Sequence, residues 1–355
     1  MKSSHKNTFL TTPPRACSLI GKRVTQTAIK SIPKSIPGEW RSRKISRKRF
    51  FMHRHVIQHI HLITNPKGGV GDNLALAEQA RKFFFSHGVS CEVHSTAAPG
   101  DATQWSAEIP QKPQTLICAM GGDGTMHEVI NGMMQREATL RMPVALIPGG
   151  TGNSFMEDLG LIHPRSAMES ILGGSPQPID LMECGLDGAI EYAFNVCGWG
   201  MMASGNQRAE SMRWMGRSRY HAAGLLEIMH CRSNHAQLEV DGKDLSAEYH
   251  LIAASNSRVV GKGMLMSPHA KHDDGLMDLL MLKKKGRRTL MRLFKGLANG
   301  THIQDPSVEY QQIREFRVRT PQSNCWNIDG EVRRANEMSV SIRSGLLNWW
   351  LPEKR

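Results

Sequence analysis

A carboxylate stands among three glycines in the segment GGDGT, residues 121–125. Gly121, Gly122 and Gly124 would let the backbone approach a ligand closely, and backbone N–H groups bind anions such as phosphate. Asp123 brings a fixed negative charge to the same loop. We interpret it as a group that organises a metal ion or accepts a proton from a hydroxyl. The alternative is an aspartate that only shapes the turn.

Two further glycine-rich loops have the same context. They are NPKGGVG (65–71) and GGTGNS (149–154), and each follows an apolar run and leads towards a helical pattern. A loop that opens a helix presents free amides and the positive end of the helix dipole to phosphate. One such loop would be weak evidence, whereas three indicate a phosphate-binding edge.

Thr125 and Glu128 fit the Ser/Thr-x-x-Glu capping box. This pattern predicts that the two side chains begin the helix after the glycines. Capping by Thr125 is compatible with a phosphate contact.

The loops are positioned by alternating strand and helix patterns. Strands are expected at 55–63, 89–96, 115–120 and 143–148, and helices at 74–88, 100–108 and 125–134. This order predicts a doubly wound parallel sheet, in which ligands bind at the carboxyl ends of the strands. All three glycine loops lie at those ends.

The pattern changes after about residue 180. Short strand-like runs follow, separated by turns such as 241–242 and 329–330, with one helix expected around 218–230. We expect an antiparallel β-sandwich. The chain therefore divides into a basic leader (1–51), an α/β domain (52–180) and a β-rich domain (181–355).

The net charge of +13 belongs to the leader. Residues 1–51 hold 13 of the 45 Lys and Arg and one acid, whereas the remainder holds 32 basic and 31 acidic residues. A folded body without a basic excess argues against a nucleic-acid partner. The leader could be a mitochondrial or plastid transit peptide, a membrane-surface arm, or the product of a start upstream of Met52.

Cysteine, histidine and apolar content further limit the compartment and the kinds of site that we expect. The seven cysteines are scattered without a disulfide or zinc spacing, which favours a reducing compartment. The 16 histidines suggest no metal site, and His55, His59 and His61 are expected on strand and loop surfaces. No run approaches the 18 apolar residues of a transmembrane helix.

Five motifs, in order, resemble the catalytic domain shared by diacylglycerol, sphingosine, ceramide and bacterial YegS-like lipid kinases. They are NPKGG (65–69), GGDGTMHEVINGM (121–133), PGGTGNSF (148–155), DDGLMD (273–278) and DGE (329–331). GGDGT alone would also suit NAD kinases and phosphofructokinases. The resemblance implies an ATP- and Mg²⁺-dependent lipid kinase, with a nucleotide-binding domain followed by a lipid-binding domain.

The resemblance also implies roles for individual residues. Asn65 and Thr96 would contact nucleotide, and either Asp123 or Glu331 would be the base on the lipid hydroxyl. Phosphate contacts would come from Gly121, Gly122, Gly124, Thr125, Thr151, Arg213 and Arg219. The alternative for the two arginines is that they are exposed helix charges.

Metal and substrate contacts follow in the same way. Asp274 and Asp329 would be metal ligands, although Asp274 before Gly275 also suits a plain turn. Asn206 stands where sphingosine kinases carry an aspartate for the lipid head group. A neutral amide cannot pair with the ammonium of a sphingoid base, which favours diacylglycerol or a related neutral lipid. A sphingoid-base or ceramide kinase and a non-catalytic regulator that binds nucleotide and lipid are the alternatives.

A kinase acting on bilayer lipid must reach a membrane surface, so we expect a cytoplasmic protein that is peripheral to the membrane. The basic segment KKKGRR (283–288) could meet anionic head groups or be a solvated hairpin tip. The tryptophans of GLLNWWLP (345–352) could lie at the interface or pack against the body. A homodimer is left open.

Overall fold

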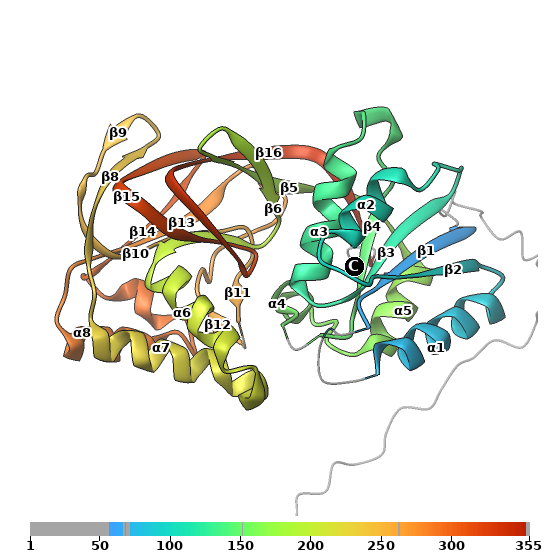
Figure 1. The fold of residues 1–355 in the computed structure, drawn as a ribbon, viewed down its shortest axis with the longest axis horizontal. Helices are drawn as coiled ribbons and strands as arrows, with labels where there is room; N and C mark the ends of the chain where they lie inside the picture. The colour runs from blue at the N-terminus through green and yellow to red at the C-terminus, as the bar shows by residue number, and fades with distance from the viewer. Residues whose placement is uncertain (1–56, 67, 69–71, 151, 262, 353–355) are drawn as a thin grey trace, which may run out of the picture. The chain divides into compact units, whose positions relative to one another are not determined.

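The computed structural model describes residues 57–352, apart from residues 67, 69–71, 151 and 262 and the side chains of Arg213, Arg217 and Ser323. The leader, His55 and the predicted phosphate ligand Thr151 therefore lie outside the described residues. Residues 52–355 form one compact unit (Figure 1).

Four parallel strands form the sheet of the first half of this unit. They are β1 (His59–Thr64), β2 (Ser90–Ser95), β3 (Thr115–Gly121) and β4 (Val144–Pro148), in the order β2-β1-β3-β4. Strands β3 and β4 are buried along their whole length. Continuous apolar runs of this kind are expected where helices cover both faces of a sheet.

The helices of this half lie on both faces of the sheet. They are α1 (Asn73–Ser86), α2 (Asp101–Glu108), α3 (Asp123–Met134), α4 (Ser154–Asp158) and α5 (Pro164–Gly173), with a short 3₁₀ turn η1 (Ala138–Leu140). Figure 1 shows α1 and α5 on one face and α2 and α3 on the other. The carboxyl ends of the strands therefore meet the amino ends of α1 and α3 at one edge.

The second half is rich in antiparallel strands, as its composition predicts. Its main strands are β5 (Gly174–Leu186), β6 (Ala189–Ala193), β7 (Val196–Gly200), β8 (Asn234–Val240), β9 (Lys243–Asp244), β10 (Ala247–Ser255), β13 (Met277–Lys283), β14 (Val308–Ile313), β15 (Glu315–Ile328) and β16 (Glu331–Pro352). A separate pair joins β11 (Val259–Val260) to β12 (Met264–Leu265). Buried Trp199, Tyr249 and Trp326 fill the core between the strands.

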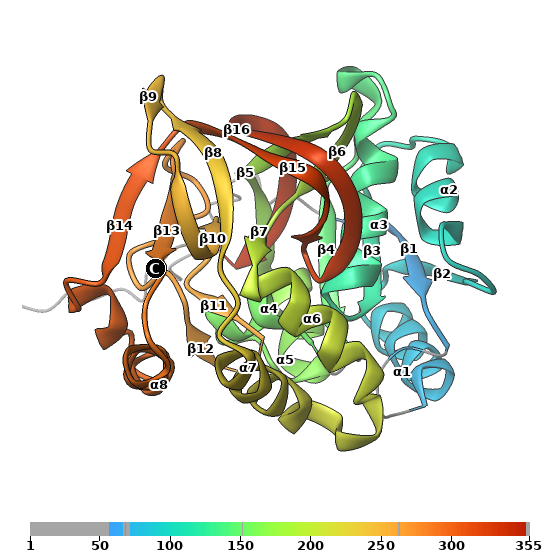
Figure 2. The same cartoon turned by 60° about the vertical axis from the view of Figure 1, so that its left-hand side comes forward.

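This half contains more helix than the one segment expected around 218–230. Besides α7 (Arg219–His230) it has α6 (Met201–Ser211), α8 (Arg287–Gly296) and the 3₁₀ turns η2 (Arg213–Ser218) and η3 (Thr301–Gln304). Figure 2 shows α6 beneath the hairpin of β15 and β16. Because α8 begins inside the basic segment 283–288, this segment joins a strand to a helix and is not a hairpin tip.

The last strand returns to the first half, which corrects the expected boundary. Near its end β16 pairs with β5, and Trp349 is the parallel partner of Val144 on β4. Trp349 packs 4.6 Å from the ring of Phe155, and Trp350 donates its indole N–H to the Ile171 carbonyl at 2.8 Å. Residues 347–352 were assigned to the β-rich domain, but they complete the α/β core, so these tryptophans do not face a membrane.

Candidate active site

A cavity of about 1020 Å³ begins at the carboxyl ends of β1, β2 and β3 and extends into the second half. It brings together most of the site residues predicted from sequence: Asn65, Thr96, Gly122, Asp123, Gly124, Thr125, Asn206, Arg219, Asp329 and Glu331. Gly121 lies just behind the wall, where a side chain would meet Thr125 Oγ1 at 2.5 Å.

The glycine loops pack against each other. Gly150 donates its N–H to the Gly121 carbonyl at 2.9 Å, and Asp123 donates its N–H to the Gly152 carbonyl at 3.0 Å. A Cβ on Gly150 would lie only 2.7 Å from the Cα of Gly122. Part of the glycine requirement is therefore close backbone approach between two loops.

Helix α3 begins at Asp123, two residues before the predicted start, and Gly122 is its N-cap. The predicted capping box is not formed. Glu128 instead accepts hydrogen bonds from the amides of Gly100 and Ala102, each at 3.2 Å, and so caps α2. No side chain at the Gly100 N-cap serves this end of α2, and Glu128 on the adjacent helix supplies the acceptor.

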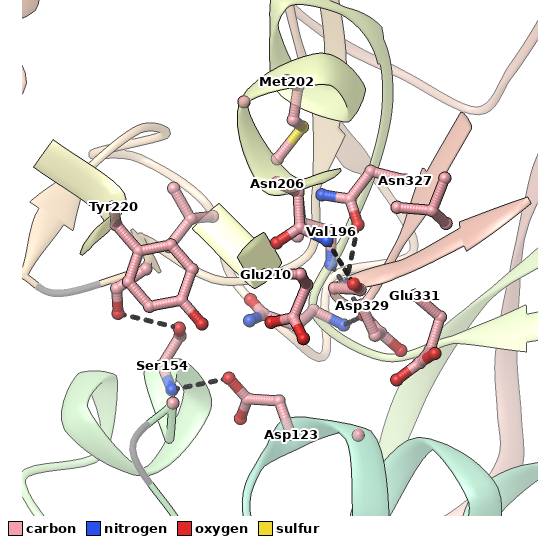
Figure 3. A pocket seen from close by; sticks show the side chains of 18 of the residues that line it. Asp123, Ser154, Val196, Met202, Asn206, Glu210, Tyr220, Asn327, Asp329 and Glu331 are labelled. Atoms are coloured by element: carbon pink, nitrogen blue, oxygen red, sulfur yellow. Dashed lines mark hydrogen bonds between the residues drawn. The ribbon is translucent and has the colours of Figure 1, made fainter. Parts of the chain in front are cut away.

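The Asp123 carboxylate points into the cavity (Figure 3). Oδ2 accepts the Ser154 amide at 2.9 Å, and Oδ1 is buried without a hydrogen-bond partner in the described part of the chain. Burial raises the pKa of Asp123 to about 6, and the negative charge of Asp329 contributes. An unpaired buried carboxylate oxygen is costly, and an Mg²⁺ ion or a hydroxyl would satisfy it.

The GGTGNS motif positions this carboxylate. Besides its amide bond to Asp123, Ser154 donates its hydroxyl to the Gly261 carbonyl at 3.1 Å. Asn153 donates its amide to the Gly150 carbonyl at 2.8 Å and closes the loop. The motif fixes Asp123 from the neighbouring strand, which sequence alone did not indicate.

Glu331 approaches the same space from the second half. It is the first residue of β16, and its side chain is 47% exposed. A Cβ on Gly124 would lie 3.0 Å from Glu331 Oε1, so this carboxylate lies over the first turn of α3. Figure 3 shows Asp123, at the start of α3, and Glu331, at the start of β16, beside one cavity.

Asp329 is held by hydrogen bonds on both carboxylate oxygens, and its metal role stays a prediction. Its Oδ1 accepts the amides of Asn195 at 2.9 Å and Val196 at 3.0 Å. Its Oδ2 accepts the Phe194 amide at 2.9 Å and lies 3.1 Å from His127 Nδ1. Both oxygens therefore have hydrogen-bond partners within the described residues, and Asp329 anchors the DGE turn.

His127 on α3 is a site residue that the sequence interpretation missed. Its Nε2 lies 2.7 Å from Glu191 Oε1, and Glu191 in turn pairs with Arg333 at 2.9 and 2.5 Å. Burial opposes protonation of His127, but its hydrogen bonds to Asp329 and Glu191 outweigh this and raise its pKa to about 9. An imidazolium between two carboxylates therefore joins the helix of the glycine loop to the DGE turn.

Asn73 is a second missed residue. Its amide donates to the carbonyls of Asn65 at 2.8 Å and Gly68 at 2.7 Å. It ties Asn65 and Gly68 to the start of α1. The sequence feature that could have identified Asn73 is its position directly after the loop, at the start of a helical pattern.

Comparisons with known proteins agree with this geometry. Residues 59–184 match the family described as diacylglycerol kinase catalytic domain, and residues 195–350 match the YegS C-terminal NAD kinase beta sandwich-like domain. A diacylglycerol kinase of Mycobacterium tuberculosis is 31% identical over 285 residues, which cover 79% of this chain and 91% of that protein. The chain belongs to the diacylglycerol kinase family of lipid kinases.

Two further similarities complete the comparison. The sphingoid long chain base kinase 4 of Schizosaccharomyces pombe is 28% identical over 75% of this chain and 69% of that protein. The fold of this chain matches the crystal structure of a putative diacylglycerol kinase from Bacillus anthracis with a TM-score of 0.69 and 23% sequence identity. The match covers 83% of this chain and 98% of that one, and it supports the mixed α/β fold with a β-sandwich-like second domain. The resemblance drawn from the motifs is confirmed.

Of the two predicted phosphate-binding arginines, only the side chain of Arg219 is described. It lines the cavity of the lipid kinase, lies 3.0 Å from Glu210 and donates to the Tyr220 hydroxyl at 2.9 Å. Its Nε is buried without a hydrogen-bond partner among the described residues. The alternative of an exposed helix charge is wrong for Arg219, whereas the side chain of Arg213 lies outside the described residues.

Two predicted residues have local structural contacts. Asn206 on α6 donates its amide to the Gly330 carbonyl, so it rests on the DGE turn inside the cavity. Asp274 lies outside this cavity in a turn, where it accepts the Leu276 amide at 3.1 Å. A metal role for Asp274 stays a prediction.

The far end of the cavity is an apolar chamber. Its wall comes from α6, β13 and α8: Met201, Met202, Leu280, Leu282, Leu290, Leu293 and Phe294. Flexible methionines and leucines of this kind suit a hydrocarbon chain. The two carboxylates therefore lie between a glycine-loop edge and an apolar chamber.

Proposed function

We propose that this lipid kinase transfers the γ-phosphoryl group of ATP to the hydroxyl of diacylglycerol or a related neutral lipid. The observation that carries the proposal is that Asp123 and Glu331 face one cavity, with glycine loops at one end and an apolar chamber at the other. Such a cavity would hold a nucleotide and a lipid chain with their reactive groups next to the carboxylates.

The phosphates of ATP would lie along the glycine loops. The first turn of α3 offers the positive end of its dipole, and Arg219 adds a cation. Asn65 and Thr96 at the ends of β1 and β2 would contact the rest of the nucleotide. Mg²⁺ would be held by Asp123, whose buried Oδ1 suits a hard cation, and would supply neutralisation of phosphate charge.

The two carboxylates would divide the work. Asp123 is fixed between the glycine loops by Ser154 and is therefore suited to organise the phosphate end. Glu331 belongs to the lipid-binding half and lies over the first turn of α3. We assign Glu331 as the group that accepts the proton of the lipid hydroxyl, because its half-exposed carboxylate can reach an incoming substrate.

Charge inside the cavity favours a neutral lipid. Glu210 pairs with Arg219 at 3.0 Å, and Glu227 pairs with Arg208 at 2.8 Å. Asn206 contributes an amide rather than a carboxylate. A sphingoid ammonium entering this part of the cavity would meet acids that are already paired, whereas a glycerol hydroxyl needs no counter-charge.

A lipid panel tests the substrate class. Purified full-length protein, labelled ATP and Mg²⁺ would be mixed with vesicles holding diacylglycerol, monoacylglycerol, phosphatidylglycerol, ceramide or a sphingoid base. We expect label in a neutral glycerolipid, at least tenfold faster than in the sphingoid base. Preferred labelling of the sphingoid base would overturn the substrate class, and no labelled lipid with any substrate would overturn the assignment.

We further propose that the enzyme acts at an anionic membrane surface, peripherally and from the cytoplasm. No helix within the described residues is both long and apolar enough to span a bilayer. The consecutive elements η2 and α7 expose Trp214 (83%) and Met229 (59%). Arg287, in the basic segment 283–288, donates to the Met229 carbonyl at 2.9 Å, so basic and apolar groups are adjacent.

Vesicle flotation tests this surface. Wild-type protein should float with vesicles that contain anionic lipid, and Met229→Glu should reduce the bound fraction several-fold. Glu108→Gln on exposed α2 is the control and should bind as wild type does. Equal binding of both variants would show that another surface docks.

A further inference from the structure

Two histidines and a glutamate come together on β1 and β2. None of the three is among the residues predicted to bind Mg²⁺ or nucleotide. His61 on β1 is the parallel register partner of Glu92 on β2. His94 lies two residues beyond Glu92, so its side chain is on the same face of the sheet. Among the described residues, this is the one group of three potential metal ligands with all ligand atoms within 4.8 Å of one another. The expectation that His61 decorates the surface is wrong, because it is buried.

The separations match the edges of a metal coordination shell. His61 Nδ1 lies 3.0 Å from His94 Nε2 and 3.5 Å from Glu92 Oε2, and His94 Nε2 lies 3.8 Å from Glu92 Oε1. Zinc–ligand bonds of about 2.0–2.1 Å in a tetrahedron place neighbouring ligand atoms about 3.3 Å apart. Small side-chain rotations would therefore direct all three ligand atoms at one ion.

The surroundings suit a closed but reachable site. The side chains of His61 and His94 are about nine-tenths buried, and the ring of Trp105 on α2 packs 4.8 Å from that of His94. Glu92 is 65% exposed, which leaves an entry path and room for a water ligand.

We propose that His61, Glu92 and His94 form a structural site for a divalent transition-metal ion of the Zn²⁺ type, completed by water. Imidazole nitrogens select this class of ion, whereas Mg²⁺ prefers oxygen ligands. An ion here would join edge strand β2 to β1, close to the strand ends that carry Thr96 and Asn65. It is separate from the Mg²⁺ of the kinase reaction.

Calorimetric titration with Zn²⁺ in excess Mg²⁺, on full-length protein freed of any histidine tag, tests the proposal. Wild type should bind one ion per chain at this site, and its thermal midpoint should rise by a few degrees. Glu92→Gln replaces an exposed ligand, so it should fold normally and bind at least tenfold more weakly. His94→Gln should lose the ion.

His59→Gln is the matched control, because His59 lies two residues before His61 on the same strand. It should keep the affinity and stoichiometry of wild type. The proposal would be overturned if wild type bound no Zn²⁺ at micromolar concentration. It would also be overturned if Glu92→Gln and His94→Gln titrated as wild type does, since the ion would then be bound elsewhere.

Discussion

At the scale of single residues, two aspartates of the site differ in how their carboxylates are hydrogen-bonded. Asp123 has one carboxylate oxygen bonded to an amide and one without a partner, and Asp329 has both oxygens saturated. The first group is available for chemistry, and the second holds a turn. Among the described residues, the same residue type is therefore left with a free acceptor in one loop and is fully hydrogen-bonded in the other.

The raised pKa of Asp123 gives a prediction for stability. A carboxyl whose folded-state pKa is about 6, above its usual 3.8, destabilises the fold as pH rises from 4 through 6. Asp123→Asn should therefore stabilise the ligand-free protein at pH 8 by about 1–3 kcal/mol. Urea unfolding at pH 8 and pH 4 checks this. The gain should be present at pH 8 and nearly absent at pH 4, and an equal effect at both values would contradict it.

Asp329→Asn should have the opposite effect. The amide nitrogen cannot accept the backbone N–H groups that the carboxylate accepts, so we expect a loss of about 3–5 kcal/mol. Asp244→Asn, on an exposed hairpin, is the matched control and should change stability by less than about 0.5 kcal/mol. Chemical denaturation of both variants at pH 7 is the measurement. A loss no larger than that of the control would refute the anchoring role.

The sequence predicted residue identities better than residue roles. Asp123 could be located from its glycine loop, and Glu331 could be located from the DGE motif of the resemblance. The anchoring role of Asp329 could not be found, because its partners at 194–196 lie more than 130 positions away. The predicted capping role of Glu128 failed for a similar reason, since the amides that donate to its carboxylate belong to the start of a different helix.

At the scale of elements, α3 is tied to the DGE turn by His127. The imidazolium joins Asp329 to Glu191, whose pKa falls to about 2 because His127 and Arg333 outweigh its burial. The helix that presents Asp123 and the turn that presents Glu331 therefore share one ionic network. Its effect is to hold the two carboxylates at a fixed spacing.

This network predicts a stability loss at alkaline pH. A histidine with a folded pKa of about 9 and an unfolded value of 6.5 contributes fully below pH 6.5 and loses its contribution as pH rises through 9. Between pH 6 and pH 10, the free energy of unfolding of wild type should fall by on the order of 3 kcal/mol more than that of His127→Gln. Guanidinium unfolding of both proteins across this range is the measurement. Parallel curves for the two proteins would show that His127 is not charged in the fold.

The sequence predicted whether most segments form a helix or a strand, but it did not predict how many helices the fold contains. The α/β half shows strong apolar runs and glycine-ended helices, so its parallel strands and helices α1, α2 and α3 lie within a few residues of expectation, whereas α4 and α5 were not expected. Helix α6 was missed because it buries few residues and has a weak apolar pattern. Helix α8 was missed although Leu290, Leu293 and Phe294 follow a helical spacing, because it begins inside a basic segment that was interpreted as a turn.

At the scale of the whole molecule, β16 is one continuous strand from Glu331 to the core of the α/β half. Glu331 and the parallel sheet are therefore covalently linked by a single extended element, which pairs with β15 over its first part and with β5 from Met338 to Pro352. The sequence divided these regions into consecutive domains, because pairing of the last strand with β4 is a long-range contact that no local pattern reports.

Loss of the packing at the end of β16 should destabilise the first half. Trp349→Ala deletes a fully buried ring that contacts Phe155 and Phe194, and should cost about 3–5 kcal/mol. Trp214→Ala, at an 83% exposed position, is the control and should cost less than about 0.5 kcal/mol. Thermal unfolding by circular dichroism compares them. Similar midpoints for the two variants would contradict the placement of β16.

The division between Asp123 and Glu331 is the central claim, and steady-state transfer of labelled phosphate to diacylglycerol vesicles tests it most directly. The kinetics of wild type, Asp123→Asn and Glu331→Gln would be measured across Mg²⁺ concentrations. We predict that Glu331→Gln lowers kcat about 10²–10⁴-fold with an unchanged Mg²⁺ requirement. Asp123→Asn should raise the Mg²⁺ requirement and also lower kcat. Near-wild-type kcat for Glu331→Gln, with the whole loss confined to Asp123→Asn, would contradict the account.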